Sequence, residues 1–144
     1  MEIYKMYVKI FIVAGILGWI IDTAYRSLTS GFFVIGAATP APFSPVYGFG
    51  AIIVYWMSKH IHQYWIGYQA LLYAGALTLY EYISGEFSVW FFGRRLWDYS
   101  EGPLNYNGHI DALHFVYWGA LALLFQRYLL PIMHVRWRRW FVVK

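Results

Sequence analysis

Two long stretches of the sequence, residues 27–58 and 60–80, carry no Asp, Glu, Lys or Arg. A helix needs roughly 20 apolar residues to cross the hydrocarbon core of a bilayer. Residues 36–45 read GAATPAPFSP, and this density of proline excludes one continuous helix over the first stretch. We therefore expect loop or re-entrant backbone there, followed by membrane spans over about 46–60 and 66–87.

The composition favours a chain that is embedded in a membrane. Hydrophobic residues make up 60% and aromatic residues 23%. Charged residues make up 12%, against about 25% in soluble domains. A soluble domain of this length has too little interior to bury so much apolar surface, and a disordered chain would be polar. The absence of cysteine excludes a disulfide scaffold, a zinc–thiolate site and a cysteine nucleophile.

Two further apolar stretches, about 7–26 and 111–130, carry charges only toward their ends. The predicted fold is therefore an all-α membrane protein, a four-transmembrane-helix bundle in a single domain over residues 1–144. A basic amphipathic tail is expected over residues 131–144. A β-barrel is disfavoured because the stretches lack the alternation of barrel strands. No cleavage site of small residues follows the first span, so we expect a retained first helix and not a signal peptide.

The basic residues favour one orientation in the membrane. Four spans place both termini on the same side, which holds eight of the eleven basic residues: Lys5, Lys9, Lys59, Arg127, Arg136, Arg138, Arg139 and Lys144. The positive-inside rule makes this side cytoplasmic, so two long loops face outward. The tail is expected to lie on anionic lipid headgroups and to bind no nucleic acid. The expected location is the cytoplasmic membrane of a bacterium.

Two acidic residues within the expected spans are candidates for a functional role. Asp22 and Arg26 are four residues apart and can pair on one helix face. Glu81 lies inside the third span, where a carboxylate that faces lipid is costly. We expect it to face other helices or a wet cavity, either as a structural carboxylate or as a proton, ion or metal site. Small residues recur at a spacing of four on the same span and favour close contact with another helix: Ala70, Ala74 and Thr78.

The segment 97–114 has the densest polar chemistry of the chain. His109, Asp111 and His114 lie within six residues, and two imidazoles with a carboxylate suit a divalent metal. The alternative is that these groups cap the fourth helix and satisfy one another, since Asp111 stands near its positive end. Asp98 is expected to cap a backbone turn through its side-chain oxygen. Apart from this metal, no cofactor is expected.

Several segments together resemble a known family. They are GWIIDTAY at 18–25, PFSPVYGFG at 42–50, EY at 81–82, WDYS at 97–100 and GHI at 108–110. In this order they resemble the ABC-transporter type IV, or CmpB-like, permeases, to which animal transmembrane protein 229 is related. The resemblance covers residues 18–119 and implies a multi-pass membrane protein associated with transport. The family pattern carries Glu where this chain has Asp22 and Arg where it has His109.

Physical reasoning and the resemblance select the same outer residues as the lining of one outward-facing polar cavity. These candidates are Asp22, Tyr47, Glu81, Trp97, Asp98, Tyr99, Asn105 and His109. An acidic lining favours a cation or a proton-coupled solute, so the first hypothesis is a permease-like or transport-associated protein. Four helices enclose little space, which predicts a homo-oligomer or a partner membrane subunit. The chain has no phosphate-binding loop, so transport driven by ATP would need a separate subunit.

Two alternatives stay open. The first is a membrane-embedded enzyme that acts on lipid headgroups or a lipid-linked substrate at the outer leaflet. It would use Glu81 or Asp98 as acid or base, with a metal on His109, Asp111 and His114. The second is a membrane scaffold without transport or catalysis, in which the polar cluster only stabilises the fold. Dependence on a divalent metal would distinguish the enzyme, and tolerance to substitution of the acids would favour the scaffold.

Overall fold

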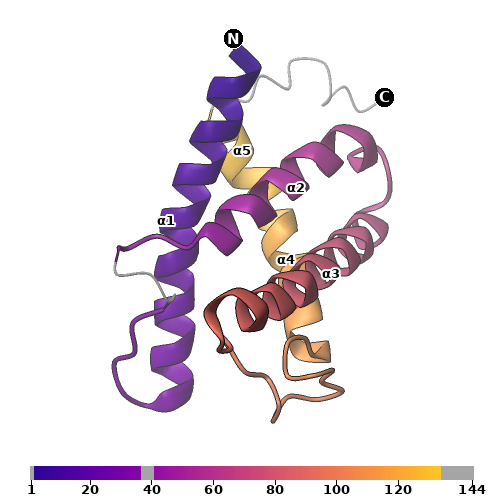
Figure 1. Cartoon of the computed structure of the whole chain (residues 1–144). Coiled ribbons are helices and arrows are strands. Elements are labelled where there is room, and N and C mark those ends of the chain that lie inside the picture. The colour runs from indigo at the N-terminus through magenta and orange to yellow at the C-terminus, as the bar shows by residue number, and fades with distance from the viewer. Residues whose placement is uncertain (1, 37–40, 134–144) are drawn as a thin grey trace.

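The computed structural model describes residues 2–36 and 41–133, and these residues form an all-helical protein (Figure 1). Its elements are α1 (Glu2–Ser30), α2 (Pro45–Ile61), α3 (Ile66–Phe92), α4 (Ala112–Leu124), the π-helix η1 (Phe125–Leu129) and α5 (Leu130–Ile132). Because α4, η1 and α5 follow one another without a break, the described residues form four long helices. Within the described part, β structure is limited to one isolated bridge between Tyr106 and Ile110.

The four helices pack as two hairpins, α1 with α2 and α3 with α4 (Figure 1). The Lys9 ammonium donates to the Met133 carbonyl at 3.0 Å, so the start of α1 lies beside the end of α5. We call this the terminal end of the molecule. The Arg26 guanidinium, near the end of α1, donates to the Leu96 carbonyl at 3.4 Å. The segment 93–111 therefore lies at the opposite end, which we call the loop end.

The expected spans correspond to the four helices, and each helix extends beyond its expected span at one or both ends. Two of them, residues 3–30 and 112–132, are long and apolar enough to cross a membrane. Large apolar side chains are exposed along the helices, for example Ile20, which is 50% exposed, and Leu79, which is 61% exposed. Such extensive exposed apolar surface is typical of a protein that contacts lipid. Residues 134–144, most of the expected basic tail, lie outside the described residues.

The connection from α1 to α2 returns along α1 before α2 begins. The Gly36 amide donates to the Thr23 hydroxyl at 2.9 Å, and the Ser44 amide donates to the Gly15 carbonyl at 2.9 Å. At 1.5 Å per residue, the distance from Ser30 back to Gly15 is about 22 Å along the helix. Part of the segment 31–44 therefore lies along α1 and is not an external loop. As a result, α2 begins level with the middle of α1.

Glycines allow this close return. A Cβ on Gly15 would overlap the Phe43 ring, and a Cβ on Gly48 would lie 2.9 Å from the Phe11 carbonyl oxygen. The start of α2 is thus packed closely against α1 at Gly48. The reason is steric, because any larger residue would push α2 away from α1.

Two of the three small residues of α3, Ala70 and Ala74, contact α4, which confirms for these two the close helix contact that the sequence favours. A Cβ on Gly119 would lie 2.9 Å from the Ala70 carbonyl oxygen and 3.3 Å from the Ala74 side chain. Gly119 therefore brings the backbones of α3 and α4 together at the small residues that are spaced four apart on α3.

The π-helix near the end of the last long helix was not expected from the sequence. The Leu130 amide donates to the Phe125 carbonyl, five residues back. Pro131 has no amide hydrogen to continue the α-helical ladder, and a π-turn is one way to accommodate that loss. Gln126 in this turn bonds to Tyr73 and Gln69 of α3, which ties the irregular turn to its neighbour.

Candidate functional site

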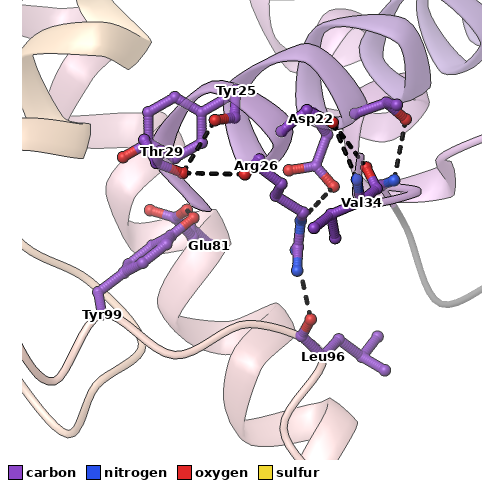
Figure 2. A network of polar contacts seen from close by, with 11 residues as sticks. Asp22, Tyr25, Arg26, Thr29, Val34, Glu81, Leu96 and Tyr99 are labelled. Carbon is purple, nitrogen blue, oxygen red and sulfur yellow. Dashed lines mark hydrogen bonds and ion pairs between the residues drawn. The ribbon is translucent and has the colours of Figure 1, made fainter. Parts of the chain in front are cut away.

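A buried carboxylate connects three elements near the loop end. Glu81 of α3 is 2% exposed. One carboxylate oxygen accepts from the Tyr99 hydroxyl at 3.0 Å, and the other accepts from the Trp118 indole at 2.8 Å. The paired groups come from α3, the segment 93–111 and α4. Figure 2 shows the Tyr99 hydroxyl pointing at Glu81. Both oxygens of Glu81 thus receive hydrogen bonds from neutral donors.

Tyr99 remains a donor at physiological pH. Burial raises the pKa of its hydroxyl far above the ordinary value, and the neighbouring Glu81 carboxylate raises it further. Its ring stacks on the His114 imidazole, with centroids 3.7 Å apart and planes inclined by 10°. The stack fixes the Tyr99 ring between α3 and α4.

The beginning of α4 is held by Asp111, which is its N-cap. One Asp111 oxygen accepts from the His114 amide at 2.7 Å and contacts the His114 Nδ1 at 2.8 Å. Because a carboxylate oxygen only accepts, Nδ1 carries the proton in this contact. The expectation that these groups cap the helix and satisfy one another is confirmed for Asp111 and His114, whereas His109 takes no part in the cap.

Replacing this cap has a predictable cost. We expect Asp111→Ala to lower stability by about 1 kcal/mol, because the first turn of α4 loses its side-chain acceptor. Asp111→Asn should retain most of the stability, since the amide oxygen can still cap the helix. The measurement is the thermal unfolding midpoint of each purified variant in dodecyl maltoside. Equal midpoints for Asp111→Ala and the wild type would contradict the role of the cap.

The expected metal ligands are not brought together. Among residues 2–36 and 41–133, no group of three or more His, Asp or Glu side chains is arranged to hold a metal ion. Asp111 and His114 bond to each other, whereas the His109 Nε2 lies 3.4 Å from Glu86 of α3. His109 is 3% exposed and packs over Gly85, where a Cβ would lie 2.6 Å from its Nδ1.

The remaining sequence candidates in the segment 93–111 bond within that segment. The Trp97 indole donates to the His109 carbonyl at 2.9 Å, and the Asn105 amide donates to the Ser100 carbonyl at 2.8 Å. Asp98 accepts from the Ser100 hydroxyl and amide, as expected for a turn cap, and these bonds lower the pKa of its carboxyl. These side chains stabilise the loop and do not line the cavity described next.

A cavity of about 270 Å³ lies between α1 and α4 near the loop end. Most of its lining surface is apolar, and we call it the polar cavity because its lining residues include Asp22, His114 and four tyrosines. Its lining residues are Ile21, Asp22, Tyr25, Tyr47, Tyr99, His114, Tyr117, Trp118, Ala120, Leu121 and Leu124. Three of the sequence candidates, Asp22, Tyr47 and Tyr99, are therefore among them. Glu81 is not, but two of the lining residues, Tyr99 and Trp118, bond to its carboxylate.

Tyr25, Tyr117 and Trp118 also line this cavity, although they were not among the candidates predicted from the sequence. One available signal was spacing, since Tyr25 lies three residues after Asp22, and Tyr117 and Trp118 lie three and four residues after His114. Each pair therefore falls on one helix face.

A second, apolar cavity of about 300 Å³ continues the first toward the terminal end. The two cavities share the lining residues Ile21, Tyr47, Trp118, Leu121 and Leu124. The apolar cavity extends past Leu17 of α1 to Tyr128 and Ile132 near the end of the last long helix. We call the two together the α1–α4 groove.

Asp22 is the carboxylate at the polar end of the groove. Its Oδ2 accepts from the Arg26 Nε at 2.9 Å, which confirms the ion pair expected from the sequence. The Arg26 guanidinium reaches on to the Leu96 carbonyl, as Figure 2 shows, and Arg26 is not among the residues that line the cavity. The ion pair thus anchors the segment 93–111 to α1.

These helices, with their exposed apolar surface and two stretches that could cross a bilayer, indicate an α-helical membrane protein. The chain belongs to the family described as "Putative ABC-transporter type IV", whose model matches residues 9–142. The resemblance seen in the sequence is thereby confirmed, and the description associates the protein with transport. No curated protein and no solved structure matches the chain.

Proposed function

We propose that this protein is permease-like, with all four helices crossing the bilayer and the α1–α4 groove as the solute-binding site. The observation that carries this proposal is the polar cavity between α1 and α4, which ends in the Asp22 carboxylate. The groove separates the first helix of one hairpin from the last helix of the other. Relative movement of two such halves around a central site is the usual mechanism of small-solute transporters.

The charges near the cavity favour a cation or a proton-coupled solute. Asp22 lines the cavity, Glu81 bonds to two of its lining residues, and Asp111 bonds to the lining residue His114. Carboxylates around a site of low polarity attract cations and repel anions.

The orientation follows from the basic residues at the terminal end. Lys9 bonds to the Met133 carbonyl there, and Lys59 lies 4.1 Å from the centroid of the Tyr55 ring. With the terminal end in the cytoplasm, the polar cavity would face outward, and the host membrane would be a bacterial cytoplasmic membrane. We propose in addition that the protein works as a homo-oligomer or with a partner membrane subunit, and that the basic tail contacts anionic lipid headgroups.

The geometry supports the enzyme alternative less well. Both Glu81 oxygens already accept hydrogen bonds, and Asp98 is occupied by Ser100 and Arg95 at the loop surface. Neither carboxylate is placed as a general acid or base toward the cavity. The scaffold alternative predicts no accessible cavity, which the following experiment addresses.

The absence of cysteine allows a direct test of access to the groove. Ala120 lines the polar cavity, so Ala120→Cys places one thiol there. A permease exposes this site alternately to both sides. We expect membrane-impermeant methanethiosulfonate reagents to modify the thiol in intact cells and, more slowly, in inside-out vesicles. Leu104→Cys, at a position 90% exposed in the loop, is the accessible control, and Leu79→Cys on the lipid-facing side of α3 is the inaccessible control.

The outcomes distinguish the hypotheses. Modification from the outside alone would contradict transport, and modification from neither side would contradict an outward-facing cavity. A cationic trimethylammonium reagent should react faster than an anionic sulfonate reagent at Ala120→Cys, after normalisation to Leu104→Cys. Asp22→Asn should reduce this preference, because it removes the carboxylate that lines the cavity.

A further inference from the structure

The walls of the polar cavity are mainly aromatic. Its rings are Tyr25, Tyr47, Tyr99, Tyr117 and Trp118, grouped with the carboxylate of Asp22. The face of an aromatic ring carries negative potential and attracts a cation within about 6 Å of its centroid. Several rings around one carboxylate form the arrangement that recognises ammonium groups.

Glu81 strengthens this arrangement through hydrogen bonds from two of the lining residues. Tyr99 and Trp118 each donate a hydrogen bond to its carboxylate, and both rings line the cavity. A donor bonded to a carboxylate is polarised, so electron density shifts toward its ring. Glu81 therefore acts on the cavity through two rings without touching a ligand.

The one basic group in the lining is held away from this role. Among the described lining residues, His114 is the only basic side chain, and its Nδ1 donates to Asp111. Arg26 neutralises part of the Asp22 charge but points to the Leu96 carbonyl, outside the lining (Figure 2). The lining thus contains one carboxylate, that of Asp22, and no lysine or arginine side chain.

The apolar cavity supplies the second half of the recognition. It shares Ile21 and Leu124 with the polar cavity and runs past Leu17 toward Ile132. An ammonium ion alone would leave this space unused, whereas a hydrocarbon chain attached to the ion would fill it. Burial of apolar area contributes about 25 cal/mol per Å².

We propose that the α1–α4 groove binds an amphiphile with an ammonium head, which lies in the aromatic cavity with its hydrocarbon chain in the apolar cavity. The ammonium amphiphile is thus the substrate class of the proposed permease. This inference rests on the proposed function only for the premise that the α1–α4 groove is the solute-binding site. Either a membrane aminolipid or a soluble long-chain amine has this chemistry.

Binding can be measured by native mass spectrometry of the full chain in phosphatidylglycerol nanodiscs. The probes are lysophosphatidylethanolamine and lysophosphatidylglycerol with the same acyl chain, hexadecyltrimethylammonium, and choline. We expect lysophosphatidylethanolamine and hexadecyltrimethylammonium to be retained. Lysophosphatidylglycerol and choline should be lost. Retention of only the lysophosphatidylethanolamine would identify a membrane aminolipid, and retention of only hexadecyltrimethylammonium would identify a soluble amine.

Variants of one ring separate a cation–π contact from simple packing. Tyr117→Leu should weaken binding of the retained probes about fivefold to thirtyfold, whereas Tyr117→Phe keeps the ring face and should bind within about threefold of the wild type. Tyr106→Leu, at a loop position 59% exposed and outside the groove, is the matched control. Tyr99→Phe should also weaken binding, because it breaks the link from Glu81 to that ring.

Equal retention of the two lysolipids would overturn the ammonium head, and choline binding as tight as that of the long-chain probes would overturn the chain. These failures are distinct from failure of transport. Selective binding together with one-sided modification of Ala120→Cys would retain this inference and reject the permease. Two-sided modification without ammonium selectivity would retain the permease and reject this inference.

Discussion

Replacement of Glu81 by leucine is expected to lower the stability of the protein by about 2 kcal/mol or more. The change leaves the Tyr99 hydroxyl and the Trp118 indole, both part-buried, without their acceptor. An unsatisfied buried donor costs about 1–3 kcal/mol. Hydrogen bonds between helices in bilayers contribute less on average, about 0.6 kcal/mol, because the unfolded chain finds other partners. We therefore expect the lower part of the range for two donors.

The test is a thermodynamic cycle in dodecyl maltoside, with the thermal unfolding midpoint as the readout. Glu81→Leu alone should show the full loss. The triple variant Glu81→Leu, Tyr99→Phe and Trp118→Phe should recover much of it, because removal of both partners removes the desolvation penalty. No recovery in the triple variant would mean that the loss comes from packing or charge, and not from the two hydrogen bonds.

Gly119→Val should destabilise the protein by about 3 kcal/mol, at the upper end of the cost of overpacking. The added Cβ would lie 2.9 Å from the carbonyl oxygen of Ala70, a backbone atom that moves only with α3 itself. The two methyl groups of valine would then force α3 and α4 apart at this contact.

Gly75→Val is the matched control for this prediction. It makes the same chemical change on α3, at a position where an added Cβ meets nothing within 4 Å. Its thermal unfolding midpoint should equal or slightly exceed that of the wild type, since valine forms helices somewhat better than glycine. If both valine variants unfold at the same temperature, the close contact between α3 and α4 is wrong.

The features that the sequence predicted correctly depend on residues close together in the chain. The helices follow from apolar stretches between charged or proline-rich segments. The Asp22–Arg26 pair and the Asp111 cap follow from spacings of four and three residues. Helical geometry brings such neighbours together whatever the rest of the fold does, so their contacts can be derived from spacing alone.

The candidate site depended on contacts that spacing does not specify. Glu81 meets Tyr99 and Trp118, which are 18 and 37 residues away in the sequence. Whether a polar side chain lines the cavity or bonds within its own loop depends on how the segment 93–111 folds. Trp97 and Asn105 bond within their own loop.

The sequence alone therefore determined the helical class and the presence of buried acids near one end, because composition and periodicity reflect local burial. The family followed from the resemblance of its motifs. Only the tertiary structure decided that α2 begins level with Gly15 and that α1 and α4 leave a groove. It also decided that Glu81 bonds to two of the lining residues. The physical reason is that close packing, set by glycines and by partners distant in sequence, fixes the positions of the helices relative to one another.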